Sequence, residues 1–142
     1  MIKITENDIE LLAIEKLEAL GYQYIYAPNI GPDGEAQERI SYEEVVLEQR
    51  LRSAITLINP TIPKESQEEA LKEVLRIHSP ELLTNNETFH RMLTEGIKVS
   101  YQQNGIQRGD LVWLIDFQNT RNNEFIVANQ FTVIENASNE LF

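Results

Sequence analysis

Apolar side chains recur at helical spacing near the start of the chain, over residues 5–20. Thr5 stands where an N-cap is expected, Asp8 completes a shortened capping box, and Gly21 supplies a left-handed stop. At roughly 100° per residue, the apolar positions of this segment cover one broad arc of a helix. The sequence therefore predicts an amphipathic first helix from Thr5 to Leu20. Its apolar arc consists of Ile9, Leu12, Ala13, Ile14, Leu17 and Leu20.

One carboxylate, that of Glu10, falls inside the apolar arc, between Leu17 and Ile14. Glu15 and Glu18 fall on the opposite side of the helix, which should face solvent. A carboxylate on the buried side is costly unless it is paired, hydrogen-bonded or bound to a cation. The residues alone leave two interpretations open. Glu10 is either an acid at the edge of the core that reaches solvent or pairs with an arginine, or a metal ligand supported by residues elsewhere.

Capping signals mark further helices in the middle of the chain. Ser41 with Glu44, and Thr84 with Glu87, each have the spacing of a full capping box. Proline and glycine interrupt the pattern before the first of these boxes, which indicates an exposed loop. The pattern predicts a strand over 22–26, a loop over 27–39, and helices over 42–58, 63–77 and 84–96.

In the last third of the chain, apolar and polar residues alternate in the pattern that is typical of β-strands. Residues 97–101 alternate apolar and polar side chains before an Asn104-Gly105 turn, which favours a hairpin. The nearly continuous apolar run over 111–117 predicts a central, doubly covered strand, and 124–135 a third long strand. We therefore expect an α+β fold in which the first helix packs with an antiparallel or mixed β-sheet, plus a helical insertion. The expected organisation is a single partial domain over 1–142, with the first helix and strand in 1–26, a loop and helical insertion in 27–96, and a β-meander in 97–135.

Charge and composition narrow the functional classes. The 142 residues include 23 acidic and 12 basic side chains, a net charge of −11, so binding of nucleic acid by this chain alone is disfavoured. The same acidity suits cation binding. The absence of cysteine excludes disulfides and thiolate metal sites, and fits a reducing compartment. With no apolar run near ~18 residues and no signal-peptide pattern, we expect a cytoplasmic protein without membrane association.

Few other residues carry a chemical signal. No phosphate-binding glycine loop or nucleophile-elbow serine is present. His78 is expected in a loop, and His90 as a packed histidine on a helix. Asp116 ends the apolar run as a strand-end cap, a salt-bridge partner or a second candidate carboxylate. Asn129 and Gln130 interrupt an apolar strand and must find hydrogen bonds if buried, so they are interpreted as structural anchors.

Several ordered blocks of the chain resemble the N-terminal endonuclease domain of the R (restriction and translocation) subunit of type I restriction enzymes. The resemblance covers nearly the whole chain, and the order of the blocks makes it more specific than any single motif. The blocks are Thr5 to Glu10, Leu17 to Tyr22, Ser41 to Leu47 with Arg50-Leu51, Leu57 to Pro60, Phe89 to Gly96, Gly109-Asp110, Leu114 to Phe117, Asn122 to Phe125, and Asn129 to Val133.

The resemblance implies a function. In that family the domain is a PD-(D/E)xK-like nuclease that cuts DNA with Mg²⁺, and the same subunit continues into an ATP-driven motor. The complete enzyme joins methyltransferase and DNA-specificity subunits and cuts far from its recognition site. A glutamate on the first helix, here matching Glu10, completes or supports the metal shell. By resemblance, Glu10 is the candidate metal-supporting carboxylate, Mg²⁺ and ATP are the cofactors of the full-length protein, and DNA is its partner.

The chain departs from the family pattern after Asn136. The family continues through Arg-Pro-Asp and a Glu-x-Lys, whereas here Ala137 to Phe142 follows. One carboxylate cannot hold octahedral Mg²⁺ tightly, so we expect a nuclease core truncated before its catalytic motif, and no DNA cleavage by this polypeptide alone. Two alternatives stay open: a non-catalytic interaction module that retains the scaffold, and an unrelated acidic α+β domain. The loop over 27–39 is not expected to contact phosphate, because its acids outnumber Arg39.

Overall fold

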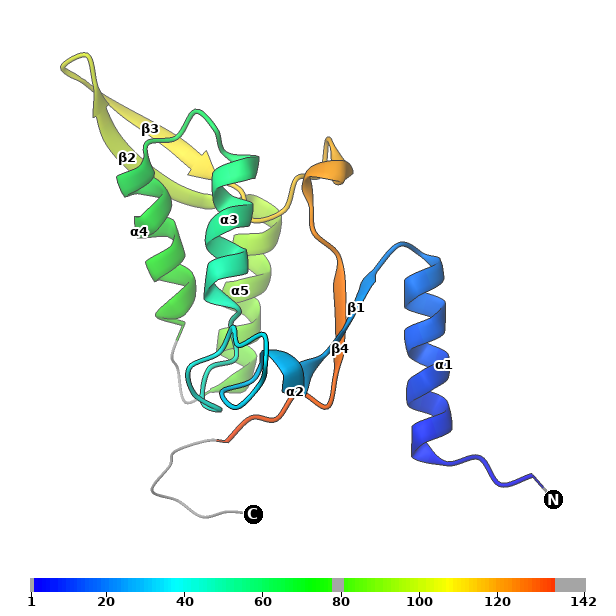
Figure 1. The fold of residues 1–142 in the computed structure, drawn as a ribbon. Coiled ribbons are helices and arrows are strands. Elements are labelled where there is room, and N and C mark those ends of the chain that lie inside the picture. Colours follow the sequence, from blue (N-terminus) through cyan, green and yellow to red (C-terminus); the bar gives the residue numbers. More distant parts are fainter. Residues whose placement is uncertain (1, 78–80, 135–142) are drawn as a thin grey trace. The chain divides into compact units, whose positions relative to one another are not determined.

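The computed structural model describes residues 2–77 and 81–134, and its fold is α+β, as expected (Figure 1). The elements form two compact units. The first combines the chain up to Leu47 with the chain from Phe125, and the second runs from Glu48 to Glu124. The first unit contains α1 (Glu6–Ala19), β1 (Gln23–Tyr26), α2 (Ala27–Ile30) and β4 (Ile126–Asn129). The second contains α3 (Glu48–Ile58), α4 (Lys64–Leu75), α5 (Leu82–Glu95), β2 (Ile97–Gln103), β3 (Ile106–Val112) and the short 3-10 helix η1 (Thr120–Asn122).

The first unit is built on a parallel pair of strands. β1 and β4 run side by side, with Tyr24 opposite Val127 and Tyr26 opposite Asn129 (Figure 1). Thr5 and Asp8 form the expected capping box at the start of α1. Gly21, with φ of 103°, takes the expected left-handed conformation after the helix.

The second unit contains the larger apolar core. Helices α3 and α4 pack together, and α4 packs against β2. The expected hairpin is confirmed: Asn104 and Gly105, with φ of 54° and 77°, form the turn between β2 and β3. The buried core side chains are Ile55, Ile62, Ala70, Leu71, Val74, Ile97, Val99, Val112 and Leu114.

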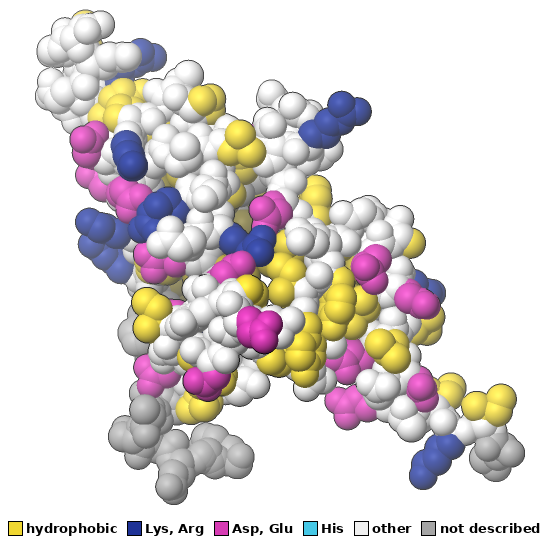
Figure 2. Space-filling view, viewed as in Figure 1, with side chains coloured by type: hydrophobic (Ala, Val, Ile, Leu, Met, Phe, Trp, Pro, Cys, Tyr) yellow, Lys and Arg dark blue, Asp and Glu magenta, His cyan; other side chains and the backbone are white. Residues whose placement is uncertain are grey.

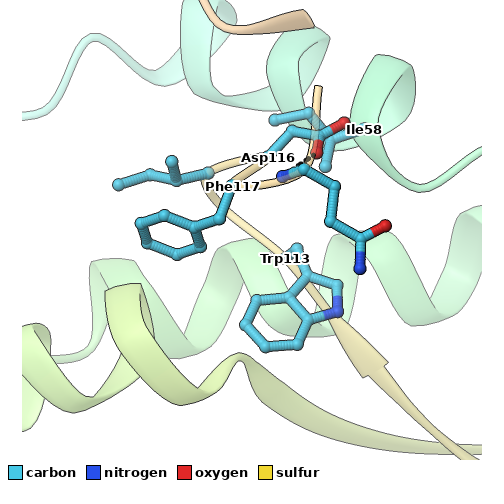
Figure 3. A pocket seen from close by; sticks show the side chains of 6 residues that line it. Ile58, Trp113, Asp116 and Phe117 are labelled. Atoms are coloured by element: carbon cyan, nitrogen blue, oxygen red, sulfur yellow. Dashed lines mark hydrogen bonds between the residues drawn. The ribbon is translucent and has the colours of Figure 1, made fainter. Parts of the chain in front are cut away.

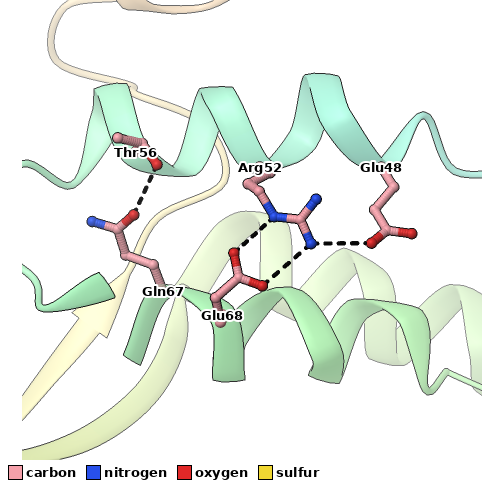
Figure 4. Close-up of polar contacts among 5 residues, drawn as sticks. All are labelled: Glu48, Arg52, Thr56, Gln67 and Glu68. Atoms are coloured by element: carbon pink, nitrogen blue, oxygen red, sulfur yellow. Dashed lines mark hydrogen bonds and ion pairs between the residues drawn. The ribbon is translucent and has the colours of Figure 1, made fainter. Parts of the chain in front are cut away.

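Polar contacts join α3 to α4 (Figure 4). Arg52 on α3 forms a bidentate ion pair with Glu68 on α4. It also donates a hydrogen bond to Glu48, one turn earlier on its own helix. One turn further along, the Thr56 hydroxyl donates to the Gln67 side chain at 2.9 Å. Because the Arg52 group is about one-third exposed, its main effect is to fix the register of the two helices rather than to add much stability.

Two expected helix starts are wrong. The helix expected from Tyr42 begins at Glu48 instead. The Glu44 carboxylate accepts from the N–H of Ile40, which closes a local turn, and Arg39 binds the Tyr42 and Glu44 carbonyls that a helix would need. The helix expected from Thr84 begins at Leu82, because Thr84 lies in its first turn and donates to Glu81 at the N-cap.

The expected meander is also wrong. β3 ends at Val112 rather than continuing to Phe117, because the Asn59 side chain binds both backbone polar groups of Trp113. The last strand spans only Ile126–Asn129, since Gln130 turns left-handed with φ of 55°. This strand pairs with β1 in parallel and not with β3.

Some expectations fall outside the described residues: the break at His78-Ser79-Pro80 and the departure over Ala137 to Phe142. The single partial domain also stays a prediction. In the part of the chain that the structure describes, no helix is both long enough and apolar enough to cross a bilayer.

Candidate functional site

The Glu10 carboxylate, in the second turn of α1, is half-buried and accepts hydrogen bonds from two consecutive amide side chains. Asn129 Nδ2 lies 2.7 Å from Glu10 Oε1. Gln130 Nε2 lies 3.1 Å from Oε1 and 3.2 Å from Oε2. Asn129 and Gln130 are separated from Glu10 by 119 and 120 positions in the sequence, and both bind its carboxylate.

A tyrosine from the neighbouring strand extends this group. The Tyr24 hydroxyl on β1 lies 2.8 Å from Asn129 Oδ1. The parallel register places Tyr24 two residues before the position opposite Asn129, which is close enough for a long aromatic side chain to reach. We call Glu10, Tyr24, Asn129 and Gln130 the Glu10 cluster. It joins α1 to both strands of the β1–β4 pair.

The surroundings of Glu10 differ from the expected apolar face. Ile14 is the buried residue of α1, whereas Ile9 is 60% and Leu12 52% exposed. Figure 2 shows apolar side chains at the surface of the protein together with acidic ones. Among the described residues no arginine or lysine forms a salt bridge with Glu10. The half-buried Glu10 carboxylate is therefore stabilised by hydrogen bonds from amide side chains rather than by an ion pair with a basic side chain.

The described residues do not fit a complete Mg²⁺ site. Within 2–77 and 81–134, no group of three or more histidine, cysteine, aspartate or glutamate side chains could hold a metal ion. Mg²⁺ requires near-octahedral oxygen ligands, and the Glu10 cluster supplies one carboxylate whose neighbours are N–H donors and a tyrosine. No cleavage step is therefore derived from this set of residues.

Asp116, the other carboxylate singled out in the sequence, organises a loop. Its Oδ1 accepts the backbone N–H groups of Gln118 and Asn119, and its Oδ2 accepts the Asn122 amide. The Asn123 side chain also exchanges two hydrogen bonds with the Asp116 backbone. The expected strand-end cap is wrong, because β3 ends at Val112 and Asp116 lies in the loop that follows. No salt bridge to Asp116 occurs in the described part of the chain.

A surface pocket of about 300 Å³ lies beside this loop (Figure 3). Both Asp116 carboxylate oxygens already accept hydrogen bonds from the loop, so the carboxylate stabilises the loop rather than offering free oxygens to a molecule in the pocket. The pocket is lined by Ile58, Trp113, Ile115, Asp116, Phe117 and Gln118.

Arg39 is a structural residue that the sequence did not reveal. Its side chain is 1% exposed, and its guanidinium donates to the backbone carbonyls of Tyr42, Glu44 and Thr132. It also lies 4.0 Å from the centroid of the Phe131 ring. The sequence predicts an exposed loop around Arg39, with several acidic neighbours, so nothing in the sequence indicates that this arginine is buried. Since its donors are engaged inside the protein, Arg39 is not available to phosphate.

Residues 3–141 match the family described as type I restriction enzyme R protein N terminus. The chain belongs to this family. It is 32% identical over 130 residues to the type I restriction enzyme HindI endonuclease subunit of Haemophilus influenzae, which covers 92% of this chain and 12% of that protein. It is 38% identical over 125 residues to the putative type I restriction enzyme MjaIXP endonuclease subunit of Methanocaldococcus jannaschii, with 88% and 12% covered. The chain thus spans about an eighth of the length of these relatives, and no solved structure matches it significantly.

Much of the family resemblance lies in residues that hold the scaffold of this R-protein region. Arg50 forms an ion pair with Glu124, which joins two of the resembling blocks. Asn59 binds the backbone just before Leu114, and Asn123 binds that of Asp116. Glu10, in contrast, is a half-buried acid of the resembling blocks that is held by amides alone in the described contacts.

The Asp116 loop predicts a pH effect. The N–H of Asn119, followed by the Asn122 amide, lowers the pKa of Asp116 in the folded protein, while desolvation opposes them. Its stabilisation is therefore present above the unfolded-state pKa of about 3.9 and is lost as the pH falls through the folded-state pKa. We expect the Asp116→Asn variant to be less stable than the parent protein at pH 7. The difference between their urea midpoints should be smaller at about pH 3 than at pH 7.

Urea unfolding of both proteins at the two pH values measures this gap. A gap that stays constant with pH would show that the loop does not depend on the charge of Asp116.

Proposed function

We propose that this chain is the N-terminal part of the endonuclease subunit of a type I restriction–modification system. In that subunit it contributes to cleavage of foreign double-stranded DNA, which requires Mg²⁺ and follows ATP-driven translocation by motor domains. Methyltransferase and specificity subunits complete the enzyme. The proposal is supported by the family match over residues 3–141 and by the similarity to two endonuclease subunits that are about eight times longer.

The observation that carries the nuclease role is the position of Glu10. A half-buried carboxylate on the first helix is fixed against the end of a parallel strand pair by two amides. We assign it the role of supporting carboxylate in the metal site of the full-length subunit. Among the described residues, no group of three or more acids, histidines or cysteines could hold a metal ion, so we expect that this chain by itself does not cut DNA.

Plasmid cleavage tests this expectation. Supercoiled plasmid incubated with the 142-residue chain and Mg²⁺ or Mn²⁺ should remain intact, because one carboxylate neither holds the ion tightly nor stabilises the developing phosphate charge. The positive control is the full-length subunit assembled with its partner subunits and ATP. Nicking by the short chain that disappears in Glu10→Ala would contradict the prediction.

A specific observation also favours a second function, a non-catalytic interaction module. Ile9 and Leu12 on α1, and Leu20 at its C-cap, are each more than half exposed, which is typical of a surface that another protein segment covers. The coding sequence that follows these residues separates the two functions. Arg-Pro-Asp and Glu-x-Lys segments followed by motor motifs support the nuclease, whereas a stop codon supports the module.

A further inference from the structure

We infer that the surface pocket beside the Asp116 loop binds a nucleobase against the aromatic side chains of Trp113 and Phe117. All residues that line this pocket belong to the second unit. The Glu10 cluster and the nuclease role proposed above therefore take no part in this binding. Three features of the pocket point to a base: its aromatic walls, the fixed backbone of those walls, and two polar groups without partners.

The walls of the pocket are mainly apolar and include two aromatic rings (Figure 3). Trp113 is half-buried, whereas Phe117 is 60% exposed, although it is a large apolar side chain. Neither ring stacks on another aromatic side chain of the described residues. Ile58 and Ile115 add aliphatic surface beside the rings. A flat ligand would gain stacking here, and removal of one stacking ring typically weakens the binding of a base about tenfold.

Hydrogen bonds fix the backbone on both sides of the pocket. Asn59 holds the N–H and the carbonyl of Trp113, each at 2.8 Å. Asp116 accepts the backbone N–H of Gln118 at 3.0 Å, which closes the loop around Phe117. Because these contacts order the walls without a ligand, binding costs little additional conformational entropy. The pocket is therefore largely formed in advance, as ligand sites usually are.

Two polar groups of the lining have no hydrogen-bond partner within the part of the chain that the structure describes. The indole N–H of Trp113 is a donor, and the side-chain amide of Gln118 is both a donor and an acceptor. The described hydrogen bonds of these two residues involve their backbone atoms. An apolar molecule that covered the two groups would leave them unpaired, which lowers affinity. The pocket therefore favours a ligand with donors and acceptors on its edge.

A nucleobase combines the features that this lining selects, because it is flat and carries donors and acceptors on its edge. A leucine or phenylalanine side chain of another protein would cover the apolar walls but leave the indole N–H unpaired. An arginine side chain is flat but only donates, so it offers the indole N–H no acceptor. Asp116 is the one charged residue of the lining, and its negative charge disfavours a phosphate group close by. We therefore expect adenosine to bind more tightly than AMP.

Fluorescence tests the inference directly, because Trp113 is the only tryptophan of the sequence. Adenosine is titrated into the 142-residue chain, with excitation at the red edge of the tryptophan band, where adenosine does not absorb. We expect saturable quenching with half-saturation at roughly 0.1–1 mM, as is typical of so small a ligand. The indole N–H resonance of Trp113 should shift over the same concentrations. No saturable response of either signal would overturn the inference.

Matched variants show whether adenosine binds in this pocket. Phe117→Ala should weaken binding about tenfold, and Gln118→Ala about fivefold. Phe89→Ala on α5 and Gln102→Ala on β2 remove the same kinds of side chain outside the lining, and should leave half-saturation unchanged. Gln118 is exposed, so its variant decides the test even if Phe117→Ala lowers the urea midpoint. Equal affinities of all four variants would overturn the inference.

Matched ligands identify the chemistry and the source of the base. Toluene has a flat ring without polar edge groups and should bind at least about fivefold more weakly than adenosine. If toluene binds equally well and Gln118→Ala has no effect, the pocket is an apolar docking site for a protein side chain, and the inference is wrong. A short single-stranded oligonucleotide of deoxyadenosine distinguishes the two sources of a base. Binding as tight as that of adenosine supports an unpaired base of a DNA strand, whereas binding of adenosine alone supports a free nucleoside.

Discussion

Replacing Arg39 with alanine is expected to lower the free energy of unfolding by about 4 kcal/mol. The change removes three charge-assisted hydrogen bonds, to the carbonyls of Tyr42, Glu44 and Thr132. The Glu44 and Thr132 carbonyls lose the arginine donor, whereas the Tyr42 carbonyl keeps the N–H of Ile134. The change also removes the guanidinium stacked 4.0 Å from the Phe131 centroid and creates a cavity, since Arg39 is 1% exposed. Small domains have only about 5–15 kcal/mol of stability, so the first unit should unfold early in urea.

Two further variants separate charge from geometry. Arg39→Lys keeps the charge but lacks the planar fork, so it should recover only part of the loss. Arg91→Ala removes an exposed arginine paired with Glu87 on the same helix, and should cost no more than about 0.5 kcal/mol. Urea unfolding followed by circular dichroism measures all three. Equal midpoints for Arg39→Ala and Arg91→Ala would refute the anchoring role.

Asn59→Ala should have the next largest effect, a loss of about 3 kcal/mol in the second unit. Asn59 is 4% exposed and forms two hydrogen bonds with the backbone of Trp113, one donated and one accepted, each of 2.8 Å. It also donates to the Ile55 carbonyl at 2.8 Å. Alanine would leave the N–H and carbonyl of Trp113 without these partners, directly where β3 ends. The thermal unfolding midpoint should therefore fall by roughly 10 °C.

Asn59→Asp tests the same contacts with almost unchanged volume. The carboxylate can still accept from the Trp113 N–H, but it faces the carbonyl oxygens of Trp113 and Ile55, so this variant should be at least as unstable as Asn59→Ala. Asn86→Ala on the exposed surface of α5 is the control and should remain within about 0.5 kcal/mol of the parent. An unfolding midpoint for Asn59→Ala equal to that of Asn86→Ala would contradict the prediction.

Local signals in the sequence predicted the elements that local interactions form. The Thr5 cap, the Gly21 stop and the Asn104-Gly105 turn are confirmed because each depends on neighbouring residues. The Ser41 capping box failed because Arg39 captures the carbonyls of that segment and ties it to Thr132, far along the chain. The continuation of β3 failed for a similar reason, the binding of Trp113 by Asn59. Both errors come from a buried polar side chain whose partners lie beyond any local window.

The candidate site was predicted in part. The helical pattern singled out Glu10 as an acid in need of partners, and the strand pattern singled out Asn129 and Gln130 as amides in need of hydrogen bonds. The structure shows that they satisfy one another. The sequence could not join them, because their pairing depends on the parallel register of β1 and β4 and on the positive φ of Gln130. Neither of these has a local signature.

The division of the chain also has a consequence for its synthesis. The second unit, Glu48–Glu124, is one uninterrupted stretch, whereas β1 must wait for β4, about a hundred residues later, before it gains its partner. On a ribosome, α3, α4 and the hairpin can fold while β1 is still unpaired. Formation of the Glu10 cluster is then among the last events, and a nascent chain released before Gln130 would have a folded middle and an unpaired beginning.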